Sequence, residues 1–239
     1  MESQTSFFDL GKWHGAIIFS AADFKDFKSY LENSSAVNLH LAGVRLISAD
    51  DDGKLIHRSL SDDSLSAAYS SKYKTSLNDS LVTHANMLLV MAGAYFENII
   101  FDFFQNYFIH NPNALYDFVG EEGNRGGIKV SEIFTFDSMR DFVRELASRG
   151  AKNAGSGSPD VIFKRVSKLT KTPVPTELTS RLKTLMSQRN TIAHEVRQYS
   201  LSQINIPDVF DTLEQMLKFL GTVSRDLGLP LHDPGHLLS

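Results

Sequence analysis

The hydrophobic positions along the chain predict a series of helices arranged around one strongly apolar stretch. Residues 81–109 are apolar nearly all round the helical turn, which is typical of a central helix that packs on several sides. Helical spacing of apolar residues predicts further helices over residues 23–32, 136–149, 178–197 and 207–227, and one more that begins at Ser158-Pro159-Asp160. These elements indicate an all-α fold.

The first 75 residues follow a different pattern. Residues 44–60 hold two short β-prone runs around Asp52-Gly53, a sequence typical of a hairpin turn, so a small β-hairpin is predicted there. The acidic residues 50–52 are interpreted as a solvated turn rather than a metal site. Residues 61–80 are polar and Ser-rich, as in a connector or an exposed helix. The predicted organisation is an N-terminal extension over residues 1–75, a helical domain over 76–228 and a flexible tail over 229–239.

Composition narrows the class of protein. A chain of 239 residues with 42% hydrophobic and 22% charged residues is that of a soluble globular protein with one sizeable core. The absence of cysteine excludes disulfides, thiol nucleophiles and cysteine-ligated metal sites, and favours a reducing, cytoplasmic location. The N-terminal residues lack the basic flank of a signal peptide, and no uninterrupted membrane span is found, so no membrane partner is expected.

The distribution of charge suggests a basic surface. The net charge is −4, but residues 140–197 hold 12 Lys and Arg against 5 Asp and Glu, while the remainder holds 12 against 23. The helix that begins at Pro159 is expected to expose Lys164, Arg165, Lys168 and Lys171. Side chains of this kind can track phosphates, so we predict that they bind RNA. The alternative is an ordinary solvated helix face.

One predicted helix, over residues 178–197, carries an arginine where an apolar residue is expected. Its apolar stripe consists of Leu178, Leu182, Leu185, Ile192 and Val196. Arg189 lies along the middle of this stripe, and Asn190 and His194 lie about 100° and 140° round the helix from it. Glu97 similarly lies on an apolar face of the 81–109 helix. Because either charge is costly to bury alone, we predict that Glu97 and Arg189 touch, within one protomer or across a dimer.

The string Arg189-Asn190-Thr191-Ile192-Ala193-His194 resembles the R-x4-6-H motif of the HEPN superfamily, in which a polar residue commonly follows the arginine. The preceding apolar segment MAGAYFENII is similar to the first core helix of such domains, and the resemblance covers residues 78–227. It implies a HEPN-like helical bundle that dimerises so that two motifs face each other. In many members it also implies metal-independent RNA cleavage in toxin–antitoxin systems or antiphage defence, with no cofactor.

On this interpretation Arg189, His194 and Asn190 are the catalytic residues, and Glu97 supports Arg189. Arginine offers a permanently charged fork for phosphate, and histidine titrates near neutral pH. The 2′-hydroxyl of RNA would supply the nucleophile. The expected partners are RNA, a second copy of the chain, and an antitoxin or other regulator. Two alternatives remain: a non-catalytic HEPN-like module that binds RNA or nucleotide, and a purely structural Glu97–Arg189 pair.

Three local features qualify this interpretation. HEPN toxins silenced by nucleotidylation carry a tyrosine two residues after the histidine, whereas this chain has Val196, with Tyr199 nearby. The glycine-rich stretch 120–127 lacks the GK[ST] of a phosphate-binding loop and is interpreted as an ordinary loop. His232 and His236 have helical metal-ligand spacing, but Pro234 between them argues against a helix and therefore against a metal site.

Overall fold

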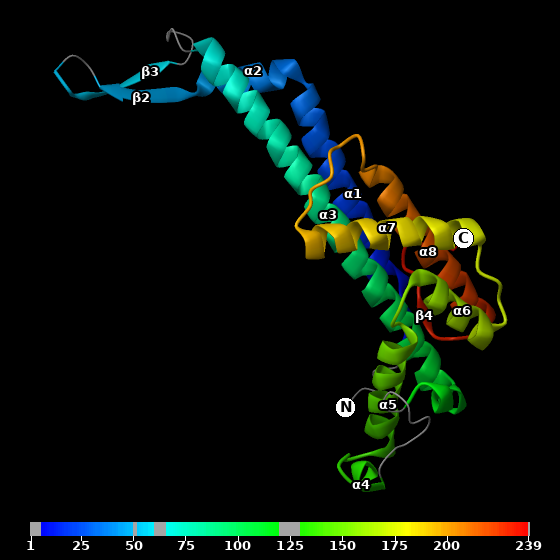
Figure 1. Ribbon diagram of the computed structural model, residues 1–239. Helices are drawn as coiled ribbons and strands as arrows, with labels where there is room; N and C mark the ends of the chain where they lie inside the picture. The colour runs from blue at the N-terminus through cyan, green and yellow to red at the C-terminus, as the bar shows by residue number, and fades with distance from the viewer. Residues whose placement is uncertain (1–5, 50–51, 60–65, 120–129, 239) are drawn as a thin grey trace.

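The computed structural model describes residues 6–49, 52–59, 66–119 and 130–238, and this part of the chain is mostly helical (Figure 1). Its elements in chain order are β1 (Phe8–Asp9), α1 (Leu10–Glu32), α2 (Ser34–Gly43), β2 (Arg45–Ala49), β3 (Leu55–Ser59), α3 (Ser66–His110), a short 3-10 helix (Pro112–Asp117), α4 (Val130–Ile133), α5 (Met139–Ala154), α6 (Pro159–Thr170), α7 (Thr176–Glu195), α8 (Ile206–Asp226) and β4 (Leu231–His232). The described part of the chain is mostly helix with little strand, which confirms the prediction of an all-α fold.

The long helix α3 is the axis of the molecule. Its 45 residues include both the apolar stretch predicted to be central and most of the polar stretch before it, which is therefore helix and not a loop. In its C-terminal half, Leu89, Phe96 and Phe104 are fully buried against a core built with α1, α5, α7 and α8. This helix is long and apolar enough to span a membrane, but half of its most apolar window is buried inside the protein. Its hydrophobicity is thus explained at least in part by core packing.

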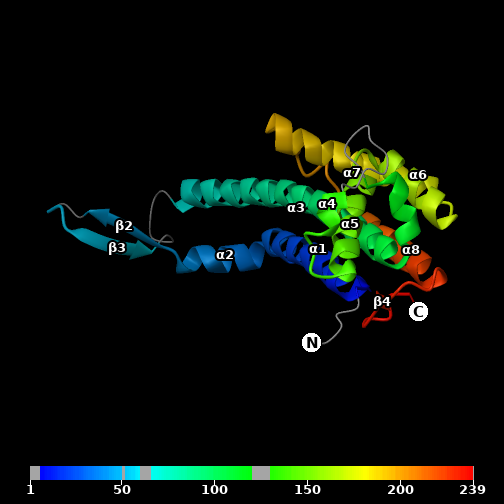
Figure 2. The same cartoon turned by 90° about the horizontal axis from the view of Figure 1, so that it is seen from below.

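An arm projects from this helical body (Figures 1 and 2). It consists of α2, the β2–β3 hairpin and the N-terminal part of α3, and α2 runs beside α3 in both views. Val37 and Leu41 of α2 form a small core of their own with apolar and aromatic side chains of α3. The two strands pair antiparallel from Arg45↔Ser59 to Ala49↔Leu55, which confirms the predicted hairpin. The predicted turn residues 50 and 51 lie outside the described residues.

The predicted boundary at residue 75 does not divide the structure. It falls inside α3, where the helix runs without interruption. Helix α1, which belongs to the proposed extension, also packs on α8 and α3 and buries Trp13, Ile17 and Phe24 in the main core. The first helix is therefore part of the helical body, because its apolar face is buried against α3 and α8.

Helices α5, α6, α7 and α8 follow the predicted order, whereas α2 and α4 were not predicted. Ser138 caps α5 by accepting a hydrogen bond from the backbone N–H of Asp141, and Pro159 lies in the first turn of α6. Asn205 caps α8, whose inner face is buried along its whole length. The glycine-rich stretch 120–127 lies outside the described residues.

The C-terminal tail was predicted to be loose, and this prediction was wrong. Strand β4 pairs in parallel with β1, with Phe8 opposite Leu231. The Asp233 carboxylate accepts hydrogen bonds from the backbone N–H groups of Leu237 and Leu238, which pack against the main core. The two prolines suggested an unstructured end, but the leucines between and after them provide apolar area that the core can bury.

Candidate site around Arg189 on α7

Helix α7 carries the candidate site at its C-terminal end. Leu178, Leu182 and Leu185 are buried, and they hold the N-terminal three turns of the helix in the core beside α3, α6 and α8. The stripe continues to Arg189, as its spacing predicts, and brings this side chain onto α3. The helix ends at Glu195, two residues earlier than predicted.

Close approach of the two helices at Gly93 seats the Arg189 side chain on α3. A Cβ atom at Gly93 would lie 2.7 Å from Arg189 Cγ and 3.3 Å from both Cδ and Nε. The aliphatic stem of Arg189 therefore occupies the space that any other residue at position 93 would fill. The Nε atom is buried there and has no hydrogen-bond partner among the described residues.

The guanidinium extends past Gly93 to two polar partners. One terminal nitrogen, Nη2, lies 3.4 Å from Glu97 Oε1, and the other, Nη1, donates a 3.0 Å hydrogen bond to the side-chain oxygen of Asn190. The predicted contact between Glu97 and Arg189 is confirmed, and it forms within one protomer. The same arrangement brings Asn190, the third predicted catalytic residue, into contact with the arginine.

The premise that Glu97 is buried was wrong. Its side chain is 49% exposed, whereas that of Arg189 is 24% exposed. Glu97 lies where α3 faces solvent beside α7, so its carboxylate keeps much of its hydration. The pair is thus a partly solvated interaction that orients the arginine, and its contribution to stability is small.

His194 lies apart from this cluster. It is exposed and makes no hydrogen bond or ion pair with any residue that the structure describes. Five residues along a helix correspond to about 140° of rotation, so α7 presents Arg189 toward α3 and His194 toward solvent. One protomer therefore brings Arg189, Asn190 and Glu97 together but leaves His194 on another side of the helix.

The segment after α7 is held by a residue that sequence reasoning did not single out. Asn86, which is 3% exposed, donates to the backbone carbonyl of Tyr199 and accepts from its N–H, both at 2.9 Å. Between this clamp and the helix, Val196 adopts a left-handed conformation with φ 54° and is 87% exposed. That conformation is strained for a β-branched residue. The sequence did offer one indication of this role, because Asn86 is a polar amide within an apolar helical stretch and a buried amide needs hydrogen-bond partners.

A groove of about 610 Å³ lies beside Arg189, between α1, α3 and the end of α7. We call it the α3–α7 groove. Most of its lining is apolar, with polar groups at the edges. The lining residues are Asp23, Thr83, His84, Asn86, Met87, Leu88, Val90, Met91, Ala94, Ile192, Val196 and Gln198. Arg189 is not one of the lining residues, but it lies close to them, because Ile192 is three residues further along α7 and Gly93, which it covers, lies between Met91 and Ala94 on α3.

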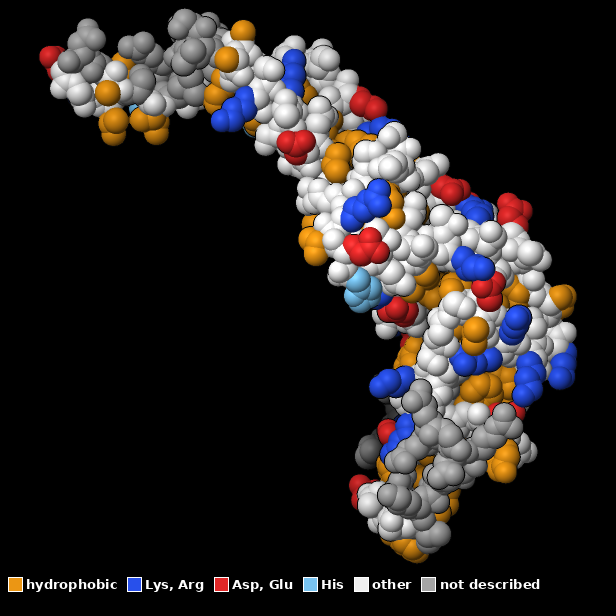
Figure 3. All heavy atoms as spheres, in the orientation of Figure 1, with side chains coloured by type: hydrophobic (Ala, Val, Ile, Leu, Met, Phe, Trp, Pro, Cys, Tyr) orange, Lys and Arg blue, Asp and Glu red, His pale blue; other side chains and the backbone are white. Residues whose placement is uncertain are grey.

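The four residues predicted to bind RNA do not form a uniform patch. Figure 3 shows basic side chains gathered over α6, and Lys164 and Lys171 are exposed. Arg165 instead donates hydrogen bonds from Nη1 to the backbone carbonyls of Asn153 and Ala154, at 3.1 and 2.9 Å, at the end of α5. Burial lowers the pKa of its guanidinium from the ordinary value, although it stays charged.

Lys168 is also engaged, since its Nζ lies 3.0 Å from a carboxylate oxygen of Asp117. Arg165 therefore caps a helix, whereas Lys164, Lys168 and Lys171 match the prediction of exposed charge, and Lys168 also forms a surface ion pair. The prediction erred for Arg165 because helical spacing shows that a side chain leaves the core face, but not what it meets there.

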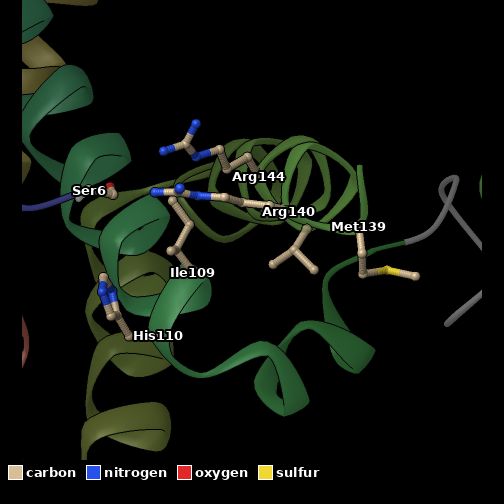
Figure 4. A pocket seen from close by; sticks show the side chains of 7 residues that line it. Ser6, Ile109, His110, Met139, Arg140 and Arg144 are labelled. Atoms are coloured by element: carbon tan, nitrogen blue, oxygen red, sulfur yellow. The ribbon is translucent and has the colours of Figure 1, made fainter. Parts of the chain in front are cut away.

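Two further arginines of the basic segment line a separate pocket of about 270 Å³ (Figure 4). Arg140 and Arg144 extend from α5 toward Ser6, and Ile109 and His110 contribute the C-terminal end of α3. This pocket is remote from the candidate site, because His110 lies 17 residues beyond Gly93 and α3 rises about 1.5 Å per residue.

Neither metal ligation nor similarity to known proteins adds to this site. Among the described residues, no group of three or more His, Asp or Glu side chains is placed to hold a metal ion. His232 instead lies 3.2 Å from the Asp9 carboxylate through Nδ1. No protein-family model, no curated protein and no solved structure matches the chain.

Proposed function

We propose that the protein is a metal-independent endoribonuclease of the HEPN type, acting in the cytoplasm as a toxin or antiphage-defence effector. The observation that carries the proposal is the placement of the motif arginine: Gly93 and Glu97 of α3 hold Arg189 close to the residues that line a groove, in contact with Asn190. An arginine fixed in this way has little rotamer freedom to lose when it binds a phosphate.

The residues would divide the reaction as follows. The 2′-hydroxyl of the substrate attacks the adjacent phosphorus to form a 2′,3′-cyclic phosphate, and the bond from phosphorus to the 5′-oxygen of the next nucleotide breaks. His194 takes the proton of the attacking hydroxyl or supplies one to the leaving oxygen, and water takes or supplies the other proton. Arg189 stabilises the charge that develops on the non-bridging phosphate oxygens. Asn190 and Glu97 keep the guanidinium in place.

The position of His194 supports a composite site. Because Arg189 and His194 point to different sides of α7, the active pair combines the arginine of one protomer with the histidine of a second copy. We therefore propose a homodimer in which the C-terminal ends of two α7 helices approach each other. An antitoxin or other regulator would act by covering this end.

Cleavage of RNA in the presence of EDTA tests the proposal. The wild type should cleave, His194→Ala and Arg189→Ala should not, and His57→Ala, which removes an exposed histidine on β3, should behave as the wild type. Mixing the two inactive variants should restore cleavage, since one of the two sites in a mixed dimer regains both residues. Absence of cleavage by the wild type on every RNA tried, or a monomer in sedimentation at micromolar concentration, would contradict the proposal.

A non-catalytic module that binds RNA or nucleotide is the second candidate. It is favoured by the exposed side chain of His194, which no described residue orients. This candidate predicts RNA binding that depends on Arg189 and no cleavage by either His194→Ala or the wild type.

A further inference from the structure

We infer that the α3–α7 groove is a subsite for an unpaired nucleobase of the RNA whose phosphate Arg189 binds. The inference rests on the proposed function in that it takes RNA as the ligand, but it concerns recognition and not cleavage. It assigns base recognition to α3 and to the end of α7, and it makes single-stranded RNA the substrate class.

The walls of the groove suit the flat face of a base. Met87 and Met91 offer polarisable thioethers, which make favourable contacts with aromatic rings, and Ile192 adds a branched apolar surface. The His84 ring also lines the groove and is held in place by two neighbours. It stacks on Phe24 at 6.4 Å between ring centroids and meets the edge of Phe27 at 5.8 Å. A ring fixed in this way can stack on a base without losing rotamer freedom.

The edges of the groove suit the polar rim of a base. The exposed Gln198 amide offers both donors and an acceptor. The Thr83 hydroxyl, which donates to the backbone carbonyl of Asp79, can still accept, and the Asp23 carboxylate can accept from an exocyclic amine. The other amide in the lining, Asn86, is committed to the backbone of Tyr199 and shapes the groove. Polar groups at the rim of an apolar cleft are the usual arrangement for a small, flat ligand.

The charges around the groove favour a nucleotide over a second apolar helix. Arg189 adjoins the groove, one turn before Ile192 on α7, where a phosphate attached to the bound base would lie. Asp23 lies in the lining contributed by α1. A ligand with one anionic group and one uncharged aromatic group satisfies the guanidinium and the apolar walls together.

The exposed apolar side chains at the entrance support a ligand of this kind. Met87 is 65% exposed and Val196 is 87% exposed, so apolar surface at the groove stays uncovered within one protomer. Val196 also has a strained left-handed conformation, three residues before the Tyr199 backbone that Asn86 binds. Strain kept next to a candidate site, and not relaxed, is typical of functional positions.

NMR of the methionine methyl groups tests the inference directly. The His194→Ala variant, labelled with ¹³C at the methionine methyls, is titrated with a short single-stranded oligoribonucleotide. The signals of Met87 and Met91 should shift, while those of Met139 and Met216, which lie outside the groove, should not. An abasic oligonucleotide, which has the same sugar–phosphate backbone but no bases, should leave all four methyl signals unshifted.

A steric variant adds a quantitative arm. Ala94→Phe fills the groove and should weaken oligonucleotide binding at least tenfold, whereas the matched change Ala68→Phe, at an exposed position of α3 outside the lining, should not. Circular dichroism checks that both variants are folded.

Each contrary outcome overturns the inference. Silent Met87 and Met91 signals, or equal shifts with the abasic strand, would show that no base enters the groove. Shifts that depend on protein concentration without RNA would show that a second copy covers it. The ribonuclease proposal can fail separately. If the Met87 and Met91 signals shift only with RNA that carries bases, but the wild type does not cleave RNA, the base subsite stands and the ribonuclease proposal is wrong. If the wild type cleaves RNA and these signals do not shift, the ribonuclease proposal stands and the base subsite is wrong.

Discussion

The substitution Gly93→Ala tests the seating of Arg189 on α3. The new methyl group would lie 2.7 Å from Arg189 Cγ, whereas carbon atoms in contact are separated by about 3.5–4.0 Å. The arginine stem must therefore move by roughly 1 Å, and this atom is near the α7 backbone, where the side chain has little freedom to yield. The movement displaces the guanidinium from its present position against Glu97 and Asn190.

Two opposing effects determine the change in stability. Replacing glycine by alanine inside a helix stabilises by about 1 kcal/mol. Overpacking against a fixed neighbour costs about 1–3 kcal/mol. We therefore expect Gly93→Ala alone to change the free energy of unfolding by between about zero and a loss of 2 kcal/mol. With Arg189→Ala as background the collision is absent, so the same change should stabilise by about 1 kcal/mol.

A double-mutant cycle measures the difference. Urea denaturation of the four proteins, at one protein concentration, should give a coupling free energy of about 1–3 kcal/mol between positions 93 and 189. Gly15→Ala is the matched control, because its nearest atom, on the Phe19 ring, is 3.9 Å away and the methyl group fits. It should stabilise both backgrounds equally. Equal effects of Gly93→Ala in both backgrounds would refute the close approach.

The same substitution should also affect catalysis. A displacement of about 1 Å in a positioned group can reduce a rate roughly 100-fold. Gly93→Ala should therefore reduce RNA cleavage by about this factor while the protein stays folded. Wild-type cleavage by this variant would mean that Arg189 does not need its place on Gly93.

Four further predictions follow from individual contacts. Glu97→Gln should slow cleavage but should change the free energy of unfolding by less than about 1 kcal/mol, because the Glu97 side chain is half exposed. A larger decrease in the free energy of unfolding, measured by urea denaturation, would contradict the exposure of Glu97. Arg165→Ala should cost about 1–3 kcal/mol through the uncapped end of α5, whereas Lys164→Ala should stay within about 0.5 kcal/mol. Asn86→Ala should cost about 1–3 kcal/mol by leaving a backbone N–H and C=O unpaired, and hydrogen exchange should rise after α7. Val196→Gly should raise the thermal midpoint by relieving about 1 kcal/mol of left-handed strain, and an unchanged or lower midpoint would argue against that conformation.

The periodic pattern of the sequence was sufficient for much of the fold. Apolar spacing determined α3, α5, α7 and α8, because a helix in water needs one apolar face to bury. The hairpin followed from a local turn sequence. The contact between Glu97 and Arg189 was also predicted, because each interrupts an apolar face, although the cost of burying an unpaired charge applies to Arg189 and not to the half-exposed Glu97. These inferences depend on interactions between residues close in sequence, or on the free-energy cost of leaving a charged side chain without a partner.

Only the tertiary structure decided which neighbours those faces meet. The sequence placed Glu97 on an apolar face but not at the solvent edge of the packing between α3 and α7. It showed Arg165 leaving a helix but not the carbonyls of α5 that receive it, and it gave no sign that Asn86 would clamp a backbone 113 residues away. The C-terminal leucines likewise found a place beside β1 that no local pattern specifies. The physical reason is that side-chain periodicity determines direction within one element, whereas burial, capping and clamping depend on distant segments that the fold brings together.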